Sequence, residues 1–298
     1  MKNIWSILKF IWSHPLASKN KYLAYKNFFT WQLVQLVFKT PILCKLVGNS
    51  KLLVEKGMSG ATGNIYVGLL EFEDMAFLLH AIKKDELFAD IGANIGVYTV
   101  LAAKNAHARV IAIEPIPRTF KHLNNNVFLN DINDSVTLLP IGVSDKNSEL
   151  YFTNTMDTIN HVVHVDDWEK NKLGVIKVDV KKIDDIFSGE IPVILKMDIE
   201  GYEWPALKGA TQALSSPLLK AVIIEINGCG KSFGFYDMDI HNLLLSYNFK
   251  PYAYSPFTRT LTLLQSYGNL NTIYIKDISW AIDRVKNADF INVLGSDI

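Results

Sequence analysis

Three short runs in this chain end in residues that could hold a small ligand. In the first, Asp90-Ile-Gly-Ala-Asn-Ile-Gly96, an apolar strand leads into a glycine turn and then into a helix. Gly92 and Gly96 carry no side chain where a ligand would press against the main chain, and the following helix directs free amides and its positive dipole end at the turn. Asp90 can accept hydrogen bonds from an ammonium group or from the turn. This run predicts a cofactor site.

An acid ends the second run, at residues 109–115. Glu114 follows the glycine turn at the spacing, about twenty residues, at which a strand-end carboxylate accepts both hydroxyls of a ribose. A dinucleotide site needs a further glycine where this sequence has Asn94. The two runs together favour a cofactor that lacks phosphate and has an amino-acid end in need of polar partners.

The third run, at residues 193–203, is an apolar strand followed by several ionisable groups. Asp198 and Glu200 come where the carboxyl edge of the strand should meet the ligand crevice of an open α/β sheet. Lys196, just before them, is expected to form an ion pair with Asp198 or Glu225. The run thus predicts acids that line the site.

The elements around these runs alternate between strands and helices, which is typical of a mostly parallel sheet. Strands are expected at residues 87–91, 110–114, 136–143, 193–198, 221–226, 250–254 and 272–276. Helices are expected at residues 75–82, 98–106, 118–130, 203–214 and 238–247. A glycine-rich junction should lead into an extended segment at 65–70, and residues 144–177 should form an irregular insertion. We predict an α/β domain over residues 58–298.

The first 57 residues form a unit with its own composition. They hold nine lysines against the single acid Glu55, and they are rich in Trp and Phe. Helical spacing predicts a helical extension whose apolar faces pack on the catalytic domain, pair in a homodimer, or contact a membrane peripherally. Neither a signal peptide nor a spanning helix is expected. The formal net charge of zero gives no attraction to nucleic acid, and the two distant cysteines fit the reducing cytoplasm.

These three runs, in this order and followed by Leu207-Lys-Gly-Ala210, resemble the FkbM family of S-adenosylmethionine-dependent methyltransferases over residues 72–225. The resemblance implies a class I, Rossmann-like fold with a seven-stranded sheet, S-adenosylmethionine as cofactor, and methyl transfer to oxygen on sugars of polysaccharides, glycolipids or polyketide-type products. The residues expected around the cofactor are Asp90, Gly92, Ala93, Asn94, Gly96, Thr99, Glu114, Pro115, Ile141, Gly142, Val143 and Asp198.

Methyl transfer to a hydroxyl requires that the acceptor lose a proton, so a base should lie near the reacting atoms. The candidates for this base are Asp198, Glu200, His161 and His164. A divalent metal is not expected, although Asp198, Glu225 and Asn227 could together hold one. Two alternatives stay open, namely a nicotinamide-dependent oxidoreductase and a non-catalytic binding protein on the same fold.

Overall fold

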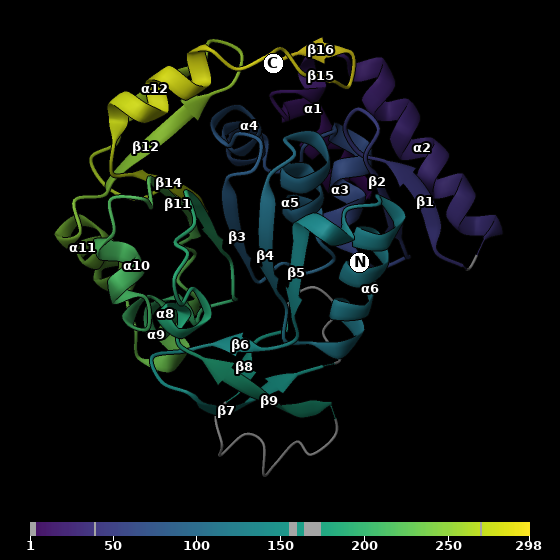
Figure 1. Cartoon of the computed structure of the whole chain (residues 1–298). Helices are drawn as coiled ribbons and strands as arrows, with labels where there is room; N and C mark the ends of the chain where they lie inside the picture. The colour runs from purple at the N-terminus through teal and green to yellow at the C-terminus, as the bar shows by residue number, and fades with distance from the viewer. Residues whose placement is uncertain (1–3, 39, 155–159, 164–173, 269) are drawn as a thin grey trace.

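The apolar runs after residue 86 pair into one large sheet. The computed structural model describes residues 4–38, 40–154, 160–163, 174–268 and 270–298. Within these residues an eight-stranded sheet has the order β13-β12-β14-β11-β10-β3-β4-β5 (Figure 1). Its strands are β3 (Leu87–Ile91), β4 (Arg109–Ile113), β5 (Val136–Leu139), β10 (Ile194–Met197), β11 (Ala221–Glu225), β12 (Lys250–Ser255), β13 (Thr260–Leu263) and β14 (Asn271–Ile275).

Six of these eight strands run in one direction. β14 is antiparallel to both β11 and β12, and β13 is antiparallel to β12, while the pairs from β5 to β11 are parallel. The predicted mostly parallel α/β sheet is therefore confirmed. The seven predicted strands all form, and β13 is an eighth at the sheet edge. Its side chains are mostly exposed, so no buried apolar run marks it in the sequence.

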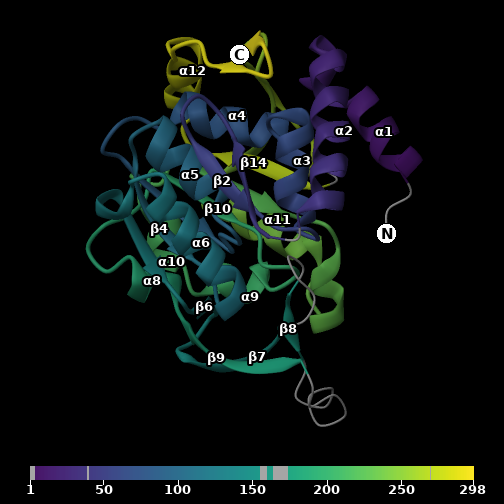
Figure 2. The same cartoon turned by 90° about the vertical axis from the view of Figure 1, so that its right-hand side faces the viewer.

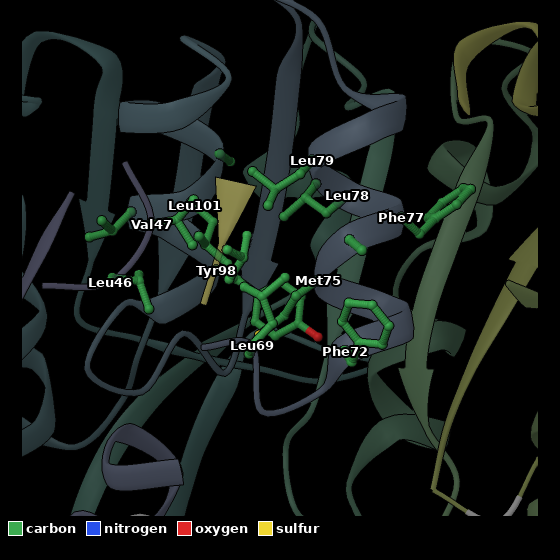
Figure 3. Packing of buried hydrophobic residues seen from close by; sticks show 14 of the residues in the cluster. Leu46, Val47, Leu69, Phe72, Met75, Phe77, Leu78, Leu79, Tyr98 and Leu101 are labelled. Atoms are coloured by element: carbon green, nitrogen blue, oxygen red, sulfur yellow. The ribbon is translucent and has the colours of Figure 1, made fainter. Parts of the chain in front are cut away.

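Helices cover both faces of the sheet, because neighbouring strand residues point to opposite sides. Ile194 belongs to one apolar cluster and Leu195 to the other. The first cluster, part of which Figure 3 shows, takes residues from α4 (Phe72–Ala81), α5 (Val97–Val100), α6 (Pro117–Leu129) and α12 (Ile278–Lys286). The second takes residues from α8 (Ile183–Ile186), α9 (Glu203–Lys208), α10 (Thr211–Ser215) and α11 (Asp237–Ser246).

The N-terminal residues pack on the first of these faces. They form α1 (Ile4–Ser13), a 3-10 turn (Ala17–Lys19), α2 (Lys21–Val37) and a hairpin of β1 (Ile42–Lys45) and β2 (Lys51–Val54). Figure 3 shows Leu46 and Val47, from the hairpin turn, in the same cluster as Leu101. The hairpin also bonds to α6, since Oδ1 of Asn126 accepts the Leu53 amide at 2.7 Å. The N-terminal segment is thus helical only as far as Val37. That residues 1–57 form a separate unit stays a prediction.

One helix replaces the expected extended segment after the glycine-rich junction. α3 spans Ser59–Val67, and its packing against α2 and β2 favours a helix that glycines disfavour in isolation. Nδ2 of Asn64 donates to the Gly60 carbonyl at 2.9 Å, and Oδ1 of Asn64 accepts the Leu70 amide at 2.8 Å. The prediction of an extended segment at residues 65–70 was wrong because the packing of α3 against α2 and β2 depends on residues distant in the sequence.

A second sheet forms where the sequence suggested an irregular insertion. It contains β6 (Gly142–Val143), β7 (Ser148–Thr153), β8 (Val162–Val163) and β9 (Val175–Lys181) in the order β6-β9-β7-β8. Figure 1 places it below the carboxyl ends of β3, β4 and β5. The expected strand at 136–143 is consequently divided between the two sheets, as β5 and β6. Of the helices in the described residues, none is both long and apolar enough to cross a bilayer.

Several short elements complete the described chain. The predicted helix at 98–106 forms as α5 followed by a π-helical turn (Leu101–Asn105), and the one at 203–214 forms as α9 and α10. Single 3-10 turns follow α6 (Asn133–Ser135) and β11 (Cys229–Phe233). The chain ends in a small hairpin of β15 (Asn292–Val293) and β16 (Ser296–Asp297).

Candidate active site

The turn after β3 is glycine-rich because the chain packs against itself there. Gly92 has φ +76°, and a Cβ at this position would lie 1.9 Å from the carbonyl oxygen of Asp198. Gly96 has φ +89°, and its Cβ would lie 2.5 Å from Cδ1 of Leu123. Close packing within the protein therefore requires glycine at both positions, and the predicted ligand contact of Gly92, which lines the cavity, stays a prediction.

A carboxylate ties this turn to the end of β4. Asn94 adopts a left-handed conformation, with φ +53°, and its amide donates to Oε2 of Glu114 at 3.0 Å. Oε1 of Glu114 accepts the Ile116 amide, also at 3.0 Å. Burial raises the pKa of Glu114 to about 7, although the two amides oppose that shift. The predicted proximity of the glycine turn and Glu114 is thus present in the structure.

Asp90, at the end of β3, keeps one oxygen without a partner. Its side chain is 1% exposed, and Oδ2 accepts the Thr99 hydroxyl at 2.6 Å. Oδ1 is buried and has no hydrogen-bond partner among the described residues. Burial raises the pKa of Asp90, and the Lys196 cation opposes that shift. A buried carboxylate oxygen of this kind is a ready acceptor for a ligand donor.

A buried lysine sits at the centre of the site. Lys196 on β10 is the register neighbour of Asp90 on β3, and its Nζ lies 3.0 Å from Oδ2 of Asp198 and 4.8 Å from the centroid of the Tyr98 ring. Burial lowers the pKa of Lys196, but the carboxylates of Asp198 and Glu71 outweigh it and raise the pKa. The lysine therefore stays cationic, and the predicted ion pair forms with Asp198.

Three further acids gather around this pair. Oε2 of Glu71 accepts the Tyr98 hydroxyl at 2.5 Å. Burial raises the pKa of Glu200 to about 7, with Asp198 adding to the shift. Burial also raises the pKa of Glu225 to about 9, and its Oε2 is buried without a partner among the described residues. The carboxyl groups around Lys196 thus differ in pKa, and therefore in how readily each accepts or keeps a proton.

These groups surround a cavity of about 270 Å³. Its walls are α3, the carboxyl ends of β3, β4, β10 and β11, and the small sheet. The residues that line it include Gly60, Ala61, Asn64, Glu71, Asp90, Gly92, Ala93, Asn94, Tyr98, Glu114, Pro115, Thr119, Gly142, Val143, Phe152, Asn160, Val162, Lys196, Asp198, Glu200, Tyr202 and Glu225. Its volume is close to the lower end of the range of about 300–1,000 Å³ that is usual for small-molecule sites.

Most of the predicted cofactor residues line this cavity, with three exceptions. Thr99 is not among the lining residues, and its hydroxyl donates a hydrogen bond to Asp90, which lines the cavity. Gly96 packs on Leu123, and Ile141 packs against the second apolar cluster, so neither is among the lining residues. Whether the others bind a cofactor stays a prediction.

Only some of the residues predicted as bases or metal ligands line the cavity. Asp198 and Glu200 line the cavity, His161 is not among the lining residues, and His164 falls outside the described residues. Asn227 is also absent from the lining, and its Oδ1 accepts the Cys229 amide at 2.9 Å. Among the described residues no group of three or more His, Cys, Asp or Glu side chains is placed to hold a metal ion.

Sequence reasoning missed the wall opposite the glycine turn. Asn64 lies on a helix that was expected to be an extended segment, and Glu71 precedes α4 without a motif around it. Phe152 lies on β7, whose burial does not alternate regularly, and Val162 lies on β8, which has only two residues. A hydrogen-bonding residue among small ones, as in Gly60 to Asn64, was the one available hint.

The chain is similar to proteins of a known family. A family model described as "Methyltransferase FkbM domain" matches residues 90–251, more than half of the chain. The chain belongs to this family. The match covers both strand ends, Lys196 with Asp198 and Glu200, and the small sheet, and it does not favour the oxidoreductase alternative.

Similar proteins carry methyltransferase names. The hexuronic acid methyltransferase AglP of Haloferax volcanii is 30% identical over 159 residues, which make up 53% of this chain and 62% of AglP. The methyltransferase sdnD of Sordaria araneosa is 28% identical over 189 residues, or 52% of this chain and 71% of that protein. A crystal structure of the methyltransferase FkbM from Methylobacillus flagellatus KT is 23% identical and covers 65% of this chain and 44% of its own, with a TM-score of 0.44.

Proposed function

We propose that this protein is an S-adenosylmethionine-dependent O-methyltransferase that acts on a hydroxyl group of a saccharide. The observation that carries the proposal is the pair of carboxylates at neighbouring strand ends, Asp90 and Glu114, on one cavity with the Asn94 turn between them. Class I enzymes bind such ligands outside the carboxyl ends of the strands. The family membership supports methyl transfer as the reaction.

The residues of the cavity suit the chemistry of this cofactor. The unpartnered Oδ1 of Asp90 would accept a hydrogen bond from the cofactor's ammonium group, and the remaining lone pairs of Glu114 would accept hydrogen bonds from the ribose hydroxyls. Gly142 and Val143 would lie against the adenine. When bound, S-adenosylmethionine supplies a methyl group on a sulfonium, which is open to in-line attack by an oxygen nucleophile.

Glu200 is the group that we propose as proton acceptor for the sugar hydroxyl. With a pKa of about 7, its carboxylate is substantially ionised at neutral pH and still basic enough to take a proton. Asp198 is held by Lys196 at 3.0 Å, which favours a role in orienting the acceptor. With its pKa of about 9, Glu225 holds its own proton near neutral pH and would donate rather than accept.

We further propose that the acceptor is a sugar and that the protein is located in the cytoplasm. The name of AglP specifies a hexuronic acid methyltransferase, and this supports a saccharide acceptor for the related chain. Tyr202 and Phe152, which line the cavity, could stack on a sugar ring. Cys44 and Cys229 are both free, which supports a reducing compartment.

The test begins with titration calorimetry of the protein against S-adenosylhomocysteine and, separately, NAD. We expect binding of the first ligand and none of the second; the reverse result would overturn the proposal in favour of an oxidoreductase. Transfer of a labelled methyl group to hexuronic acids and neutral hexoses then identifies the acceptor class. The same assay with EDTA tests the expectation that no divalent metal takes part. If S-adenosylhomocysteine binds but Glu200→Gln leaves transfer unchanged, the proposed base is wrong.

A further inference from the structure

α2 is apolar on two opposite sides. Its inward side places Ala24, Phe28 and Trp31 in the core. Its outward side carries a second stripe at helical spacing, in which each side chain is more than half exposed: Tyr22, Phe29, Leu33, Leu36 and Val37. A helix that packs only on its own domain needs one apolar stripe, so the second requires another explanation.

α1 extends this outward surface. Trp5 and Trp12 are 76% and 59% exposed, and Figure 2 shows α1 beside α2 on the same flank of the molecule. The Tyr25 hydroxyl donates to the Leu8 carbonyl at 3.1 Å, which joins the two helices. In the part of the chain that the structure describes, ten of the twenty exposed large apolar side chains lie between residues 4 and 43. We call the outward sides of α1 and α2 the outer helix face.

Cations accompany the apolar side chains of the outer helix face. Lys9 on α1 and Lys26 on α2 are both exposed, and Nζ of Lys21 lies 3.3 Å from the centroid of the Trp12 ring. The sequence has no acid before Glu55, whereas residues 58–298 carry 21 basic against 29 acidic side chains. Against a second copy of itself this face would bring lysines together, but anionic lipid headgroups would complement it.

We propose that the outer helix face docks the protein on an anionic lipid bilayer, with α1 and α2 lying in the interface. Exposed tryptophans, a Tyr and a Phe beside lysines are the residues that favour the boundary between headgroups and acyl chains. No helix of the described residues can span a bilayer, so the contact is peripheral. This surface binds whether or not the cavity accepts a cofactor.

Docking would bring the bilayer within one helix of the cavity. Nδ2 of Asn27 on α2 donates to the Ile65 carbonyl on α3 at 3.1 Å, and Nε2 of Gln32 donates to the Tyr66 hydroxyl at 3.1 Å. α3 in turn contributes Asn64 to the cavity wall. The outer helix face is thus positioned to hold the site close to a membrane surface.

Cosedimentation of the full chain with vesicles tests the docking. Vesicles of phosphatidylcholine with an equal share of phosphatidylglycerol are compared with vesicles of phosphatidylcholine alone. We expect the protein to prefer the anionic vesicles, and we expect the triple variant Phe29→Gln, Leu33→Gln, Leu36→Gln to bind them at least ~10-fold more weakly. The charge reversal Lys9→Glu with Lys26→Glu should weaken binding by ~10-fold or more and abolish the lipid preference.

A matched triple variant controls for the loss of exposed apolar surface. Phe128, Leu218 and Leu270 are 72%, 58% and 65% exposed and lie outside the outer helix face, so their change to Gln should leave vesicle binding as in the wild type. Equal binding by the outer-face triple variant, or no binding by the wild type, would overturn the proposal. So would a wild-type dimer in analytical ultracentrifugation that the outer-face variant converts to a monomer, because the face would then join two copies. S-adenosylhomocysteine binding by the same samples reports separately on the proposed function.

Discussion

Nζ of Lys196 lies 3.0 Å from Oδ2 of Asp198 inside a cavity that Glu71, Asp90, Glu114, Glu200 and Glu225 also line. The lysine is 4% exposed and is the register neighbour of Asp90. Its charge offsets the repulsion among Asp90, Asp198 and Glu71, and this allows several acids to share one small space. The lysine therefore supports both the stability of the fold and the protonation states of the site.

Replacement of this cation should be costly. Lys196→Met leaves Asp198 without its partner in a largely buried site, and loss of one member of such a pair destabilises a protein by about 3–5 kcal/mol. Urea unfolding measures the change. The matched control is Lys177→Met, which breaks an exposed pair with Glu149 and should cost about 1 kcal/mol or less. Equal losses in the two variants would contradict the central role of Lys196.

A methyl group added to the turn after β3 should disrupt the fold. Gly92→Ala places a Cβ 1.9 Å from the Asp198 carbonyl oxygen, so β10 and the turn must separate. We expect a loss of at least ~3 kcal/mol in the free energy of unfolding. Gly189→Ala is the control, because Gly189 also has a positive φ, of +96°, but nothing lies within 4 Å of its Cβ position. Only backbone strain of about 1–2 kcal/mol should appear there.

We expect the carboxylate of Glu114 to contribute directly to ligand binding, beyond forming part of the cavity wall. In Glu114→Gln an amide NH₂ faces a backbone N–H of Asn94 or Ile116, and the carboxylate proposed to grip the ribose is gone. We expect S-adenosylhomocysteine binding to weaken by ~10- to 100-fold, as for loss of a buried acceptor. Calorimetry measures it, with the exposed Glu149→Gln as the control. Unchanged affinity in Glu114→Gln would refute the ribose assignment.

The rate of methyl transfer should depend on pH through Glu200. Its raised pKa, about 7, means that the carboxylate loses its capacity to accept a proton as the pH falls below that value. We expect kcat/KM to drop about tenfold for each unit of pH below ~6.5 and to level off above ~7.5. Because Glu114 and Glu203 also have pKa values of about 7, the Glu200→Gln variant decides the assignment. Its residual activity should lose this acid limb, and a retained limb would point to another group.

Glu225 should make the protein less stable as the pH rises. Its pKa is about 9 in the folded protein, well above the value of about 4.3 for an unfolded chain, so the folded state binds the extra proton between these values. The stability present below pH ~4.5 is consequently lost as the pH rises through ~9. Chemical unfolding at pH 5, 7 and 9 should show this decline, and Glu225→Gln should flatten it. A wild-type profile that rises with pH, or an unaltered profile in the variant, would contradict the shift.

Local patterns were sufficient to predict one half of the site. The segment from β3 through the turn to α5 is contiguous, and Glu114 ends the very next strand, so their proximity follows from the alternation of strands and helices. The mostly parallel sheet was predictable for the same reason. In each case a continuous apolar run marked the buried strand, and every partner strand came from its own continuous segment.

The other half of the cavity depended on contacts between distant segments. α3 contains Gly60 and Gly63, which disfavour a helix in isolation, and it is packed against α2. β6 and β8 are strands of only two residues, and they pair with β9 and β7. Gly92 also has a tertiary reason to be glycine, because a Cβ there would meet the Asp198 carbonyl oxygen. The amino-acid pattern determined the elements and the two acids at the strand ends, because these depend on neighbours in the chain. Tertiary packing alone decided the opposite wall and brought Glu71 and Tyr98 to Lys196, because these residues are far apart in sequence.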